Sequence, residues 1–478
     1  MAEIGPLVLD VDGTFLKTDL LFESFWAALG KRPIATLGVI ARNIRRPAEM
    51  KRELAELADL RLDLMPVNPD IAQLAVEGVG SGREVVLASA SDKQYVAGLA
   101  ETYGLSGRVF ASDGKTNLKG PAKATQLVAE FGDRGFDYAG DSAVDRVVWE
   151  HSENALIVGD RPAEAKALTE SGHSVTQFVA GWRKRDLIRA LRPHQWVKNI
   201  LLFLPMIAAH SFDMETLLLV VLGIAAFSAA ASSIYIVNDL LDLEADRLHP
   251  TKCNRPFASG AVPIRVGMVT FLALVVISFG LGTALGPLFL GVLVLYMLLS
   301  LSYSLKLKRM RWVDIATLAG LYTLRVIAGA AASQVEASAF MLVFIFPVFI
   351  TLGCVKRMTE LTLATSDERL PGRGYGRPDR GDLLNVSGLG MFFALLVFFF
   401  YSFSDQARTL YPDQWIMWLA LIPIAAWLFR MIRLGYYGKQ DYDPIVFALK
   451  DKRGLGLLLF TLSMMFYAAG YWQEWLGF

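Results

Sequence analysis

Residues 238–246 carry four carboxylates and a carboxamide at the end of a long apolar run. Asp239, Asp242 and Asp246 recur at spacings of three and four residues, and a helix would place them on one face. Carboxylate oxygens on one face can hold Mg²⁺ against a phosphate or a diphosphate, and the Asn238 amide can orient them. Acidic residues against a membrane-spanning helix usually have a function. The segment therefore predicts a site for a metal-bound anionic substrate.

Basic residues follow this acidic segment directly and favour the same interpretation. They are Arg247, Lys252 and Arg255. Guanidinium and ammonium groups bind phosphates through charge-assisted hydrogen bonds, so both signs of charge that a Mg²⁺-phosphate site needs lie within one short stretch. The alternative is a polar helix end that is merely exposed to water, and these cations make it the weaker interpretation.

Composition divides the chain into two parts. Of its 478 residues, 54% are hydrophobic and the mean hydropathy is +0.40. These values are too high for an ordinary soluble enzyme, although roughly the first third of the chain has a soluble composition. The net charge of +1 gives no electrostatic reason to expect a nucleic acid as partner. Two isolated cysteines, Cys253 and Cys354, provide neither a disulfide framework nor a metal site.

The C-terminal part contains about nine apolar segments, most of them long enough to cross a bilayer. They lie near 198–212, 215–237, 263–283, 286–305, 312–332, 338–356, 386–404, 414–433 and 454–473. The first is short and contains Pro205, which predicts a broken or tilted helix. Lysine and arginine are concentrated in alternate connections, and the positive-inside rule places these loops and the N-terminus in the cytoplasm. We therefore expect a multi-pass protein of a bacterial-type inner membrane with its active sites on the cytoplasmic side.

The acidic motif after the second apolar segment, Asn-Asp-x-x-Asp-x-x-x-Asp, resembles that of the UbiA superfamily of intramembrane prenyltransferases. Further stretches are similar to its decaprenyl-phosphate phosphoribosyltransferase branch. They are residues 192–199, 249–256, 303–306 and 324–329 and the motif Lys356-Arg357-x-x-Glu360. The resemblance implies an all-α polytopic membrane bundle of about nine transmembrane helices, Mg²⁺ as cofactor, and polyprenyl phosphate and phosphoribosyl pyrophosphate as substrates.

The chain departs from the aromatic prenyltransferases of this superfamily at one position. Those enzymes usually carry a second motif, Asp-x-x-x-Asp, for a second Mg²⁺ on a prenyl diphosphate. Here Asp314 stands alone, because Leu318 lies four positions further on. One metal cluster with nearby basic groups suits one diphosphate and one monophosphate. This favours phosphoribosyl pyrophosphate as donor and a polyprenyl monophosphate as acceptor; transfer from a prenyl diphosphate to an aromatic or other acceptor is the alternative.

The resemblance also assigns roles to residues of the membrane part. Asp239, Asp242 and Asp246 would bind metal and diphosphate, with Asn238 orienting them. The other substrate-binding candidates are Lys198, Tyr303 and Lys306 for the prenyl phosphate, Lys252, Arg255, Lys356 and Arg357 for the donor phosphates, and Asn199, Asp314, Arg325 and Glu360. Each basic residue could instead serve only to set the membrane topology.

The N-terminal part begins with an apolar strand that ends in Asp-Val-Asp-Gly-Thr at residues 10–14. A lone Asp-x-Asp is common, but this sequence at the end of a buried strand resembles the first motif of the haloacid dehalogenase superfamily. The resemblance implies a Rossmann-like α/β domain, with Asp10 as nucleophile and Asp12 as general acid for the leaving alcohol. The helical pattern between Thr14 and Ser89 predicts a small cap over the site.

The other motifs of that superfamily follow in order. Their candidate residues are Ser89, Lys119, Lys123, Asp141 and Asp145. Ser89 would bind the transferring phosphoryl group, and Lys123, with Lys119 as second choice, would neutralise its charge. Asp141 would hold Mg²⁺ together with the two aspartates of the first motif, and Asp145 is a secondary candidate. A degenerate domain with only a structural role is the alternative, but no catalytic element is missing from the sequence.

These observations predict two domains, residues 1–180 and 198–478, joined by a basic amphipathic connector over residues 181–197. The expected protein is a bifunctional enzyme of cell-envelope precursor synthesis. Its membrane domain would attach 5-phosphoribose to a polyprenyl phosphate, and its soluble domain would remove the 5-phosphate. A membrane anchor with a phosphate-sensing domain is a non-enzymatic alternative, disfavoured by two complete sets of motifs. Neither the chain length of the lipid nor the oligomeric state follows from the sequence.

Overall fold

The computed structural model describes residues 5–364, 367–370, 373–440 and 443–477. The chain forms two compact units. The first comprises Met1–Leu191 and Tyr235–Phe271, and the second comprises Arg192–Ile234 and Leu272–Phe478. The acidic motif therefore groups with the N-terminal residues, although in sequence it lies between the segments of the second unit.

A six-stranded parallel sheet forms the centre of the first unit, and it confirms the predicted α/β architecture of this region. The strands are β1 (Leu7–Leu9), β2 (Val85–Asp92), β3 (Val109–Ser112), β4 (Asp137–Gly140), β5 (Asn154–Val158) and β6 (Ser174–Phe178). Their order in the sheet is β3-β2-β1-β4-β5-β6. From β1 the chain adds β2 and β3 on one side, and it then returns to add β4, β5 and β6 on the other side, so the switch lies between β1 and β4. In open α/β sheets, ligands bind at such a switch point, outside the carboxyl ends of the strands. Many superfamilies share this topology, so membership in the haloacid dehalogenase superfamily stays a prediction.

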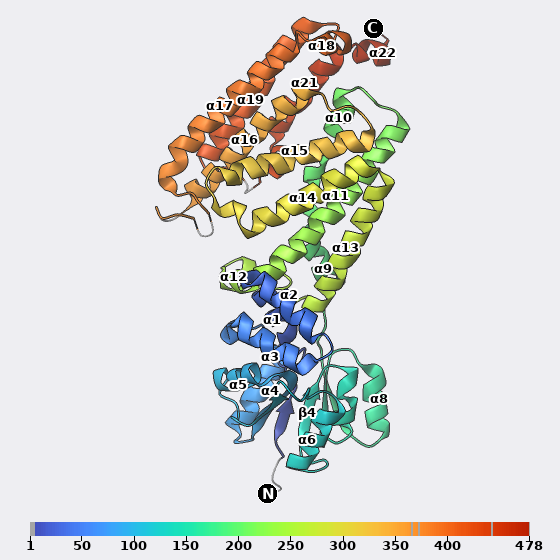
Figure 1. Ribbon diagram of the computed structural model, residues 1–478, viewed down its shortest axis with the longest axis vertical. Helices are drawn as coiled ribbons and strands as arrows, with labels where there is room; N and C mark the ends of the chain where they lie inside the picture. Colours follow the sequence, from blue (N-terminus) through green and yellow to red (C-terminus); the bar gives the residue numbers. More distant parts are fainter. Residues whose placement is uncertain (1–4, 365–366, 371–372, 441–442, 478) are drawn as a thin grey trace. The chain divides into compact units, whose positions relative to one another are not determined.

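Helices cover both faces of this sheet (Figure 1). Those packed on it are α4 and α5 on one face and α6, α7 and α8 on the other. The helical elements of residues 5–191 are α1 (Leu20–Lys31), α2 (Pro33–Asn43), α3 (Pro47–Ala58), η1 (Leu62–Leu64), α4 (Pro69–Gly80), α5 (Lys93–Thr102), α6 (Pro121–Phe131), η2 (Ala143–Asp145), α7 (Arg146–Trp149), α8 (Pro162–Glu170) and α9 (Lys184–Leu191). Five of them, α2, α3, α4, α6 and α8, begin with proline, whose fixed φ and missing N–H suit the first helical position. The insert between Thr14 and β2 is helical, as predicted, from α1 to α4.

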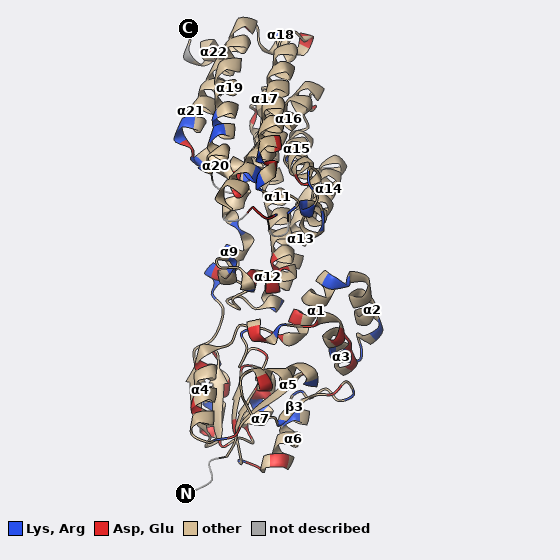
Figure 2. Ribbon diagram, turned by 90° about the vertical axis from the view of Figure 1, so that its left-hand side faces the viewer, with Lys and Arg blue, Asp and Glu red and all other residues tan. Residues whose placement is uncertain are grey.

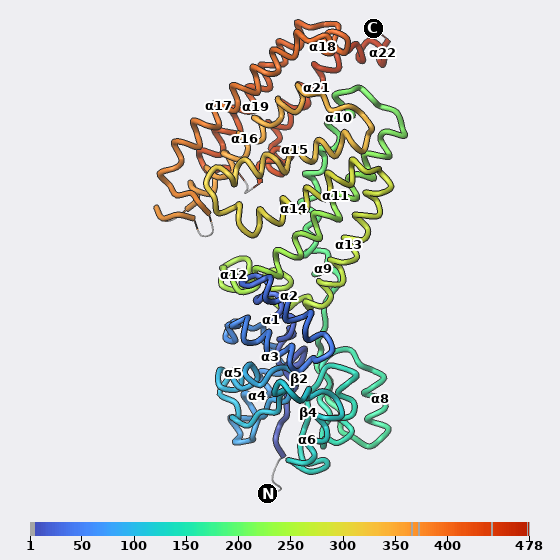
Figure 3. Tube along the Cα trace, viewed as in Figure 1, coloured from blue at the N-terminus to red at the C-terminus, as the bar shows by residue number. Residues whose placement is uncertain are grey.

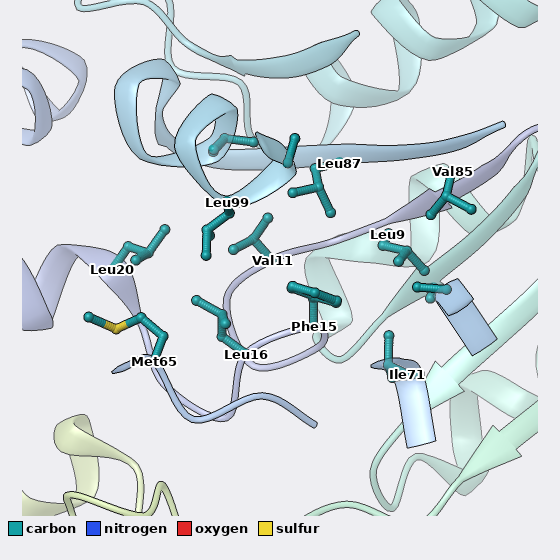
Figure 4. Packing of buried hydrophobic residues seen from close by; sticks show 14 of the residues in the cluster. Leu9, Val11, Phe15, Leu16, Leu20, Met65, Ile71, Val85, Leu87 and Leu99 are labelled. Atoms are coloured by element: carbon teal, nitrogen blue, oxygen red, sulfur yellow. The ribbon is translucent and has the colours of Figure 1, made fainter. Parts of the chain in front are cut away.

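Alternate residues of the short strand β1 belong to different cores. Leu7 and Leu9 pack with Ile71 of α4 and Leu99 of α5, as Figure 4 shows for part of this cluster. Val8 belongs to the opposite cluster, with residues of α6, α7 and α8. A central parallel strand is buried on both faces, which is why its sequence is an uninterrupted apolar run.

The second unit is entirely helical in the described residues. Its elements are η3 (Pro193–Leu202), α10 (Phe203–Ala208), α11 (Met214–Leu241), α13 (Ile264–Ala284), α14 (Pro287–Leu305), η5 (Leu307–Arg309), α15 (Val313–Ser333), α16 (Ala339–Leu363), η6 (Arg377–Asp379), α17 (Arg380–Tyr401), α18 (Asp405–Leu410), α19 (Gln414–Tyr436), α20 (Pro444–Lys450), α21 (Lys452–Ala468) and α22 (Tyr471–Leu476). The C-terminal part of α11 and the N-terminal part of α13 belong to the first unit. Between these two helices lie α12 (Leu243–Leu248) and η4 (Lys252–Asn254) of the first unit.

Seven helices among the described residues are long and apolar enough to cross a membrane. Together with the family match reported below, they make this an integral membrane protein. The predicted count of nine is not confirmed. The first predicted segment forms the 3₁₀ helix η3 and the six-residue α10, and the ninth forms α21, which has 17 residues. Figure 2 shows that the long helices of the second unit carry few charged residues along their middles.

Candidate functional sites

The predicted phosphatase residues converge at the carboxyl end of the parallel sheet. Asp10 directly follows β1, and Asp141 directly follows the neighbouring strand β4. Lys123 lies in the first turn of α6, and Asp145 in η2. Gly13 has a φ of +81°, and a Cβ at this position would lie 2.3 Å from Asp141 Oδ2. Only glycine allows this close approach, so the Asp-x-Asp-Gly motif fixes how near the two strand ends can come.

Lys123 is the centre of a buried hydrogen-bond network. Its Nζ donates to Asp10 Oδ1 at 2.7 Å and to the Tyr138 hydroxyl at 2.8 Å. The Tyr138 hydroxyl in turn donates to Asp145 Oδ1 at 2.8 Å, and Lys123 Nζ lies 3.7 Å from that same oxygen. Burial disfavours the charged form of Lys123, but Asp10 and Asp145 outweigh it and raise its pKa. The ammonium group therefore stays charged between two carboxylates.

Three carboxylates of this cluster are close enough to share a metal ion. Ligand oxygens of Asp10, Asp141 and Asp145 all lie within 4.8 Å of one another. Oxygens bound about 2.1 Å from Mg²⁺ lie at most roughly 4.2 Å apart, so a small adjustment closes the site. Burial and the Asp145 carboxylate raise the pKa of Asp141 to about 7. Burial likewise raises the pKa of Asp10 well above its usual value, although Lys123 opposes it. The cluster is short of positive charge, which suits a divalent cation.

The Asp12 carboxylate is held beside this cluster by other partners. Its Oδ1 accepts from the backbone N–H of Leu20 at 2.8 Å. Its Oδ2 accepts from the hydroxyls of Ser89 and Ser91 at 3.0 and 2.6 Å. Ser89 therefore lies against the first motif, and its role in binding a phosphoryl group stays a prediction. Asp12 itself is not one of the three carboxylates that group around a possible metal position among the described residues.

The acidic motif lies where α11 ends and α12 begins. Asp242 interrupts the helix with φ −102° and ψ 16°, yet its N–H donates to the Asn238 carbonyl at 3.0 Å and its carbonyl accepts from Asp246 at 2.8 Å. Asp239 and Asp246 are each 2% exposed. Arg255 Nη1 donates to both of them, at 3.0 and 2.6 Å. Two of the three predicted metal ligands thus share one guanidinium group.

The surroundings of this motif fit a cation with an anionic ligand. The Asn238 Oδ1 is buried and has no hydrogen-bond partner among the described residues. A buried acceptor without a donor usually marks the place of a water, an ion or a bound group. Burial raises the pKa of Asp246, although Arg255 opposes this rise. Lys252, the other predicted phosphate ligand of this segment, is exposed.

A polar cluster lies among α14, α15 and α16 of the second unit. The fully buried Asp314 accepts from Arg357 Nε at 2.5 Å and from the Tyr303 hydroxyl at 2.8 Å. Arg357 also pairs with Glu360 on the same helix. Arg373 Nη1 donates to the Tyr303 hydroxyl at 3.2 Å and lies 3.7 Å from Asp314 Oδ1. Four predicted residues from three separate parts of the sequence are therefore brought together, with Arg373 as a fifth member.

A second buried cluster connects η3 with α15 and α14. Arg325 Nε donates to Asn199 Oδ1 at 3.0 Å, and its Nη2 donates to the Tyr296 hydroxyl at 2.9 Å. The Asn199 amide donates to Ser228 Oγ at 2.9 Å. The guanidinium also lies over the Tyr296 ring, 4.7 Å from its centroid. Asn199 and Arg325 therefore hold helices together and orient the neighbouring residue Lys198.

Lys198 forms an ion pair with Asp443, which precedes α20. Burial by itself raises the pKa of Asp443, but the ammonium groups of Lys198 and Lys356 outweigh it and lower the pKa to about 2. The positive charges of both predicted phosphate ligands therefore act on this one carboxylate, and Lys198 also contacts it directly. Lys306, the remaining lysine candidate of this unit, is exposed at the end of α14.

An apolar cavity of about 550 Å³ lies within the second unit beside this ion pair. Its lining is mostly aliphatic and aromatic and comes from η3, α10, α16, α17, α19, α20 and α21. Ile200 and Ile445, which follow Lys198 and Asp443 by two positions, belong to the lining, and so does Leu352, one helical turn before Lys356. Charge at one side and apolar walls elsewhere are the features of a site for an amphiphile.

Sequence reasoning missed three residues of these sites. Lys51 of α3 reaches the phosphatase cluster, where its Nζ donates to the Ala90 carbonyl at 2.6 Å. Asp443 and Arg373 complete the two clusters of the second unit. The Asp-Pro pair at Asp443 is a helix-start signal that could have been noticed, but nothing local indicates a lysine as its partner. Arg373 lies in a connection rich in arginine, and its sequence neighbours do not indicate a specific partner.

Comparisons with known proteins agree with these features of the membrane part. The sequence model of the UbiA prenyltransferase family matches residues 200–450. The protein y4nM of Sinorhizobium fredii is 33% identical over 96% of this chain and 90% of its own length. The decaprenyl-phosphate phosphoribosyltransferase of Mycobacterium tuberculosis is 38% identical over 185 residues, which are 37% of this chain and 61% of that enzyme.

Among solved structures, a UbiA homolog from Archaeoglobus fulgidus bound to GPP and Mg²⁺ is 14% identical. The match covers 60% of this chain and 99% of that protein, with a TM-score of 0.46. The match to y4nM covers so much of both chains that it includes the N-terminal domain as well as the membrane part.

The buried Lys123 and the exposed Lys119 allow a matched test of the first cluster. Lys123→Met keeps most of the side-chain volume but leaves Asp10 and Asp145 without their cation. We expect it to destabilise the N-terminal domain by about 3–5 kcal/mol in the absence of Mg²⁺, the usual cost of removing one partner of a buried ion pair. Amide hydrogen exchange in β1 and β4 measures this loss. Lys119→Met should leave exchange unchanged, and equal effects of the two substitutions would contradict the assignment of Lys123.

Proposed function

The chain belongs to the UbiA prenyltransferase family, and on this premise we propose that its membrane part transfers 5-phosphoribose from phosphoribosyl pyrophosphate to a polyprenyl phosphate. We propose further that the N-terminal domain then removes the 5-phosphate as a haloacid dehalogenase-type phosphatase. The observation that carries the first proposal is the apolar cavity of the second unit with the Lys198, Asp443 and Lys356 cluster beside it.

The acceptor is the better supported of the two substrates. A polyprenyl phosphate has a long apolar chain and one compact anionic end. The cavity supplies apolar walls for the chain, and Lys198 and Lys356 supply two ammonium groups that face a single carboxylate. Lysine binds phosphate as a point charge, so the lipid phosphate would exchange with the Asp443 carboxylate as the partner of these cations.

The donor is assigned to the acidic motif. Mg²⁺ in proteins is commonly bound through one or two carboxylates and completed by phosphate oxygens. Asp239, Asp242 and Asp246 supply the carboxylates, and Arg255 and Lys252 would contact the phosphates. When bound, Mg²⁺ would neutralise charge on the leaving diphosphate. The region that is 38% identical to a decaprenyl-phosphate phosphoribosyltransferase supports the choice of a ribosyl donor over a prenyl one.

The reaction forms one bond and breaks one at ribose C1. The C1–oxygen bond to the diphosphate breaks, and pyrophosphate leaves with the electron pair. An oxygen of the lipid phosphate forms the new C1–oxygen bond, so no general base is needed for an acceptor that is already ionised. The residues of the site would contribute by positioning both anions and by stabilising the charge that develops on the leaving group.

The product of this step carries a 5-phosphomonoester, which is the substrate class of the proposed phosphatase. Asp10 would attack phosphorus, Lys123 would neutralise the transferring group, and Asp12 would protonate the ribose 5-oxygen as it leaves. Ser89 and Lys51 would contact phosphoryl oxygens. Asp10, Asp141 and Asp145 fit Mg²⁺ by the arrangement of their oxygens. Water would then hydrolyse the aspartyl phosphate.

Both steps need their substrates on one side of the membrane. The basic loops and the N-terminal domain are proposed to lie in the cytoplasm, at the inner membrane of a bacterial-type cell, where phosphoribosyl pyrophosphate is available. A phosphatase tethered to the membrane part would meet the lipid product at an effective concentration of roughly millimolar.

The acidic motif provides a direct test of the transferase. Asp239→Asn should lower ribosyl transfer to polyprenyl phosphate about a hundredfold or more, because a charged group that stabilises the leaving diphosphate is lost. Transfer of radiolabelled ribose into lipid, measured with the full chain in nanodiscs, gives the rate. Glu244→Gln, an exposed acidic residue of the same segment, is the control and should retain near-normal activity. Near-normal transfer by Asp239→Asn would remove the motif from the mechanism.

Competition between lipids separates the two candidate substrate pairs. Because Leu318 stands where a second metal ligand would be needed, polyprenyl monophosphate should inhibit binding of a labelled acceptor much more strongly than polyprenyl diphosphate does. Saturable transfer of a prenyl group to an aromatic acceptor such as 4-hydroxybenzoate would instead support prenylation as the activity.

The phosphatase proposal predicts a change of product. Asp10→Asn keeps the size of the side chain but removes its nucleophilic charge, so the variant should consume phosphoribosyl pyrophosphate and accumulate lipid that retains the ribose 5-phosphate. Wild-type protein should release inorganic phosphate as well as pyrophosphate. Mass spectrometry of the extracted lipids distinguishes the two products. If wild-type lipid also retains the 5-phosphate, the N-terminal domain acts on another substrate or on none.

A further inference from the structure

The acidic motif and the N-terminal domain are joined by a buried ion pair. Arg247, the residue after Asp246, donates from Nη2 to Glu23 Oε1 at 2.5 Å and from Nη1 to Glu23 Oε2 at 3.2 Å. The two side chains are 6% and 2% exposed. Glu23 belongs to α1, the first helix of the N-terminal insert. Both residues lie in the first compact unit, so the pair is part of its interior.

Arg247 and Glu23 each form a further hydrogen bond with another protein group. Arg247 Nε donates to the Ala258 carbonyl at 3.0 Å, and the Thr18 hydroxyl donates to Glu23 Oε1 at 2.6 Å. Two parallel N–H bonds from a guanidinium to a carboxylate fix distance and orientation together. The Nε, Nη1 and Nη2 atoms of Arg247 all donate hydrogen bonds to protein acceptors. Its role is therefore structural, in contrast to the phosphate contacts proposed for Arg255 and Lys252.

A second close contact joins the same two segments. Gly260 has a φ of +70°, and a Cβ there would lie 2.7 Å from Lys17 Cβ and 3.1 Å from Pro66 Cγ. At the other end, a Cβ on Gly30 of α1 would lie 3.8 Å from Leu241, the last residue of α11. The trace in Figure 3 shows α12 close to α1, the helix that carries Glu23. The segment 241–260 is thus in contact with the N-terminal domain at its start, at Arg247 and at its end.

This contact region lies between the two candidate sites. The N–H of Leu20, the first residue of α1, donates to Asp12 Oδ1 at 2.8 Å, and Glu23 lies in the first turn of that helix. On the other side, Asp246 precedes Arg247 and shares Arg255 with Asp239. The chain of contacts from Asp12 to Asp239 therefore contains one ion pair that crosses from the N-terminal domain to the acidic motif.

We propose that Glu23 is a positioning residue for the transferase, and that the N-terminal domain acts as the docking partner that holds the acidic motif in its binding geometry. This role is independent of phosphatase chemistry. It rests on the proposed function for its effect on activity, but the positioning itself is a property of the protein without substrate. Loss of the Glu23 carboxylate leaves the buried Arg247 without its anion, so α12 and the following loop must rearrange.

The test uses the full chain in nanodiscs with Glu23→Gln, which keeps the size of the side chain and removes its charge. The matched control is Glu56→Gln, which removes the carboxylate of an exposed ion pair with Arg52 on α3. Amide hydrogen exchange is measured over residues 243–260, and the kinetics of ribosyl transfer are measured at varied phosphoribosyl pyrophosphate and at varied lipid.

Glu23→Gln should accelerate exchange over residues 243–260 at least tenfold, while β1 and β4 keep the protection of the wild type. It should lower kcat/KM for phosphoribosyl pyrophosphate about 10- to 100-fold, as loss of supporting contacts around ligands typically does, with a much smaller change in KM for the lipid. Glu23→Asp retains the charge and should be intermediate. Glu56→Gln should match the wild type in both measurements.

The outcomes distinguish this inference from the proposed function. Unchanged exchange over residues 243–260 in Glu23→Gln overturns the docking role, whatever the activity. Accelerated exchange with wild-type kinetics overturns the positioning role. If the wild type transfers no ribose while exchange in Glu23→Gln is accelerated, the proposed activity fails and the docking of the segment stands.

Discussion

The cost of burying a carboxylate dominates the polar architecture of this protein. An ionised group removed from water is tolerated only when an opposite charge and hydrogen bonds replace its hydration. Three of the buried acidic clusters accordingly have a cation placed between two carboxylates. Lys123 lies between Asp10 and Asp145, Arg255 between Asp239 and Asp246, and Arg357 between Asp314 and Glu360. The cations come from elements distant in sequence from at least one partner, so charge compensation also fixes which elements pack together.

This constraint divides the basic residues of the membrane part into two kinds. Arg325 and Arg357 are buried and held by protein acceptors, so they shape the bundle and orient Asn199 and Tyr303. Lys252 and Lys306 are exposed and can reach an anion without breaking a buried pair. Lys198 is intermediate, because its carboxylate partner also faces Lys356. The two ammonium groups outnumber the single carboxylate, so this cluster carries a net positive charge that an anionic headgroup would compensate.

The sequence predicted the elements whose signals are local. The apolar run before Asp10, the order of the later motifs and the long hydrophobic segments give the parallel sheet and the seven long helices. Pro205 correctly indicated irregularity in the first membrane segment, which is the 3₁₀ helix η3 followed by the short α10. What the sequence did not give is pairing across distance: Asp443 with Lys198, Lys51 with the phosphatase cluster, and the grouping of residues 235–271 with the N-terminal domain.

The pair formed by Glu23 and Arg247 is the extreme case, because its members are 224 positions apart in the sequence. A glutamate in the first turn of an amphipathic helix and an arginine after an acidic motif are each ordinary, and neither predicts the other. Only the fold shows that the charge of each residue is compensated by the other. These contacts are the physical basis for the proposal that the acidic motif depends on the N-terminal domain for its geometry. Removing the N-terminal domain would expose Leu241 and Gly260 and leave Arg247 unpaired beside Asp246. The two parts are therefore physically interdependent at the segment that carries the acidic motif, whatever substrate the N-terminal domain acts on.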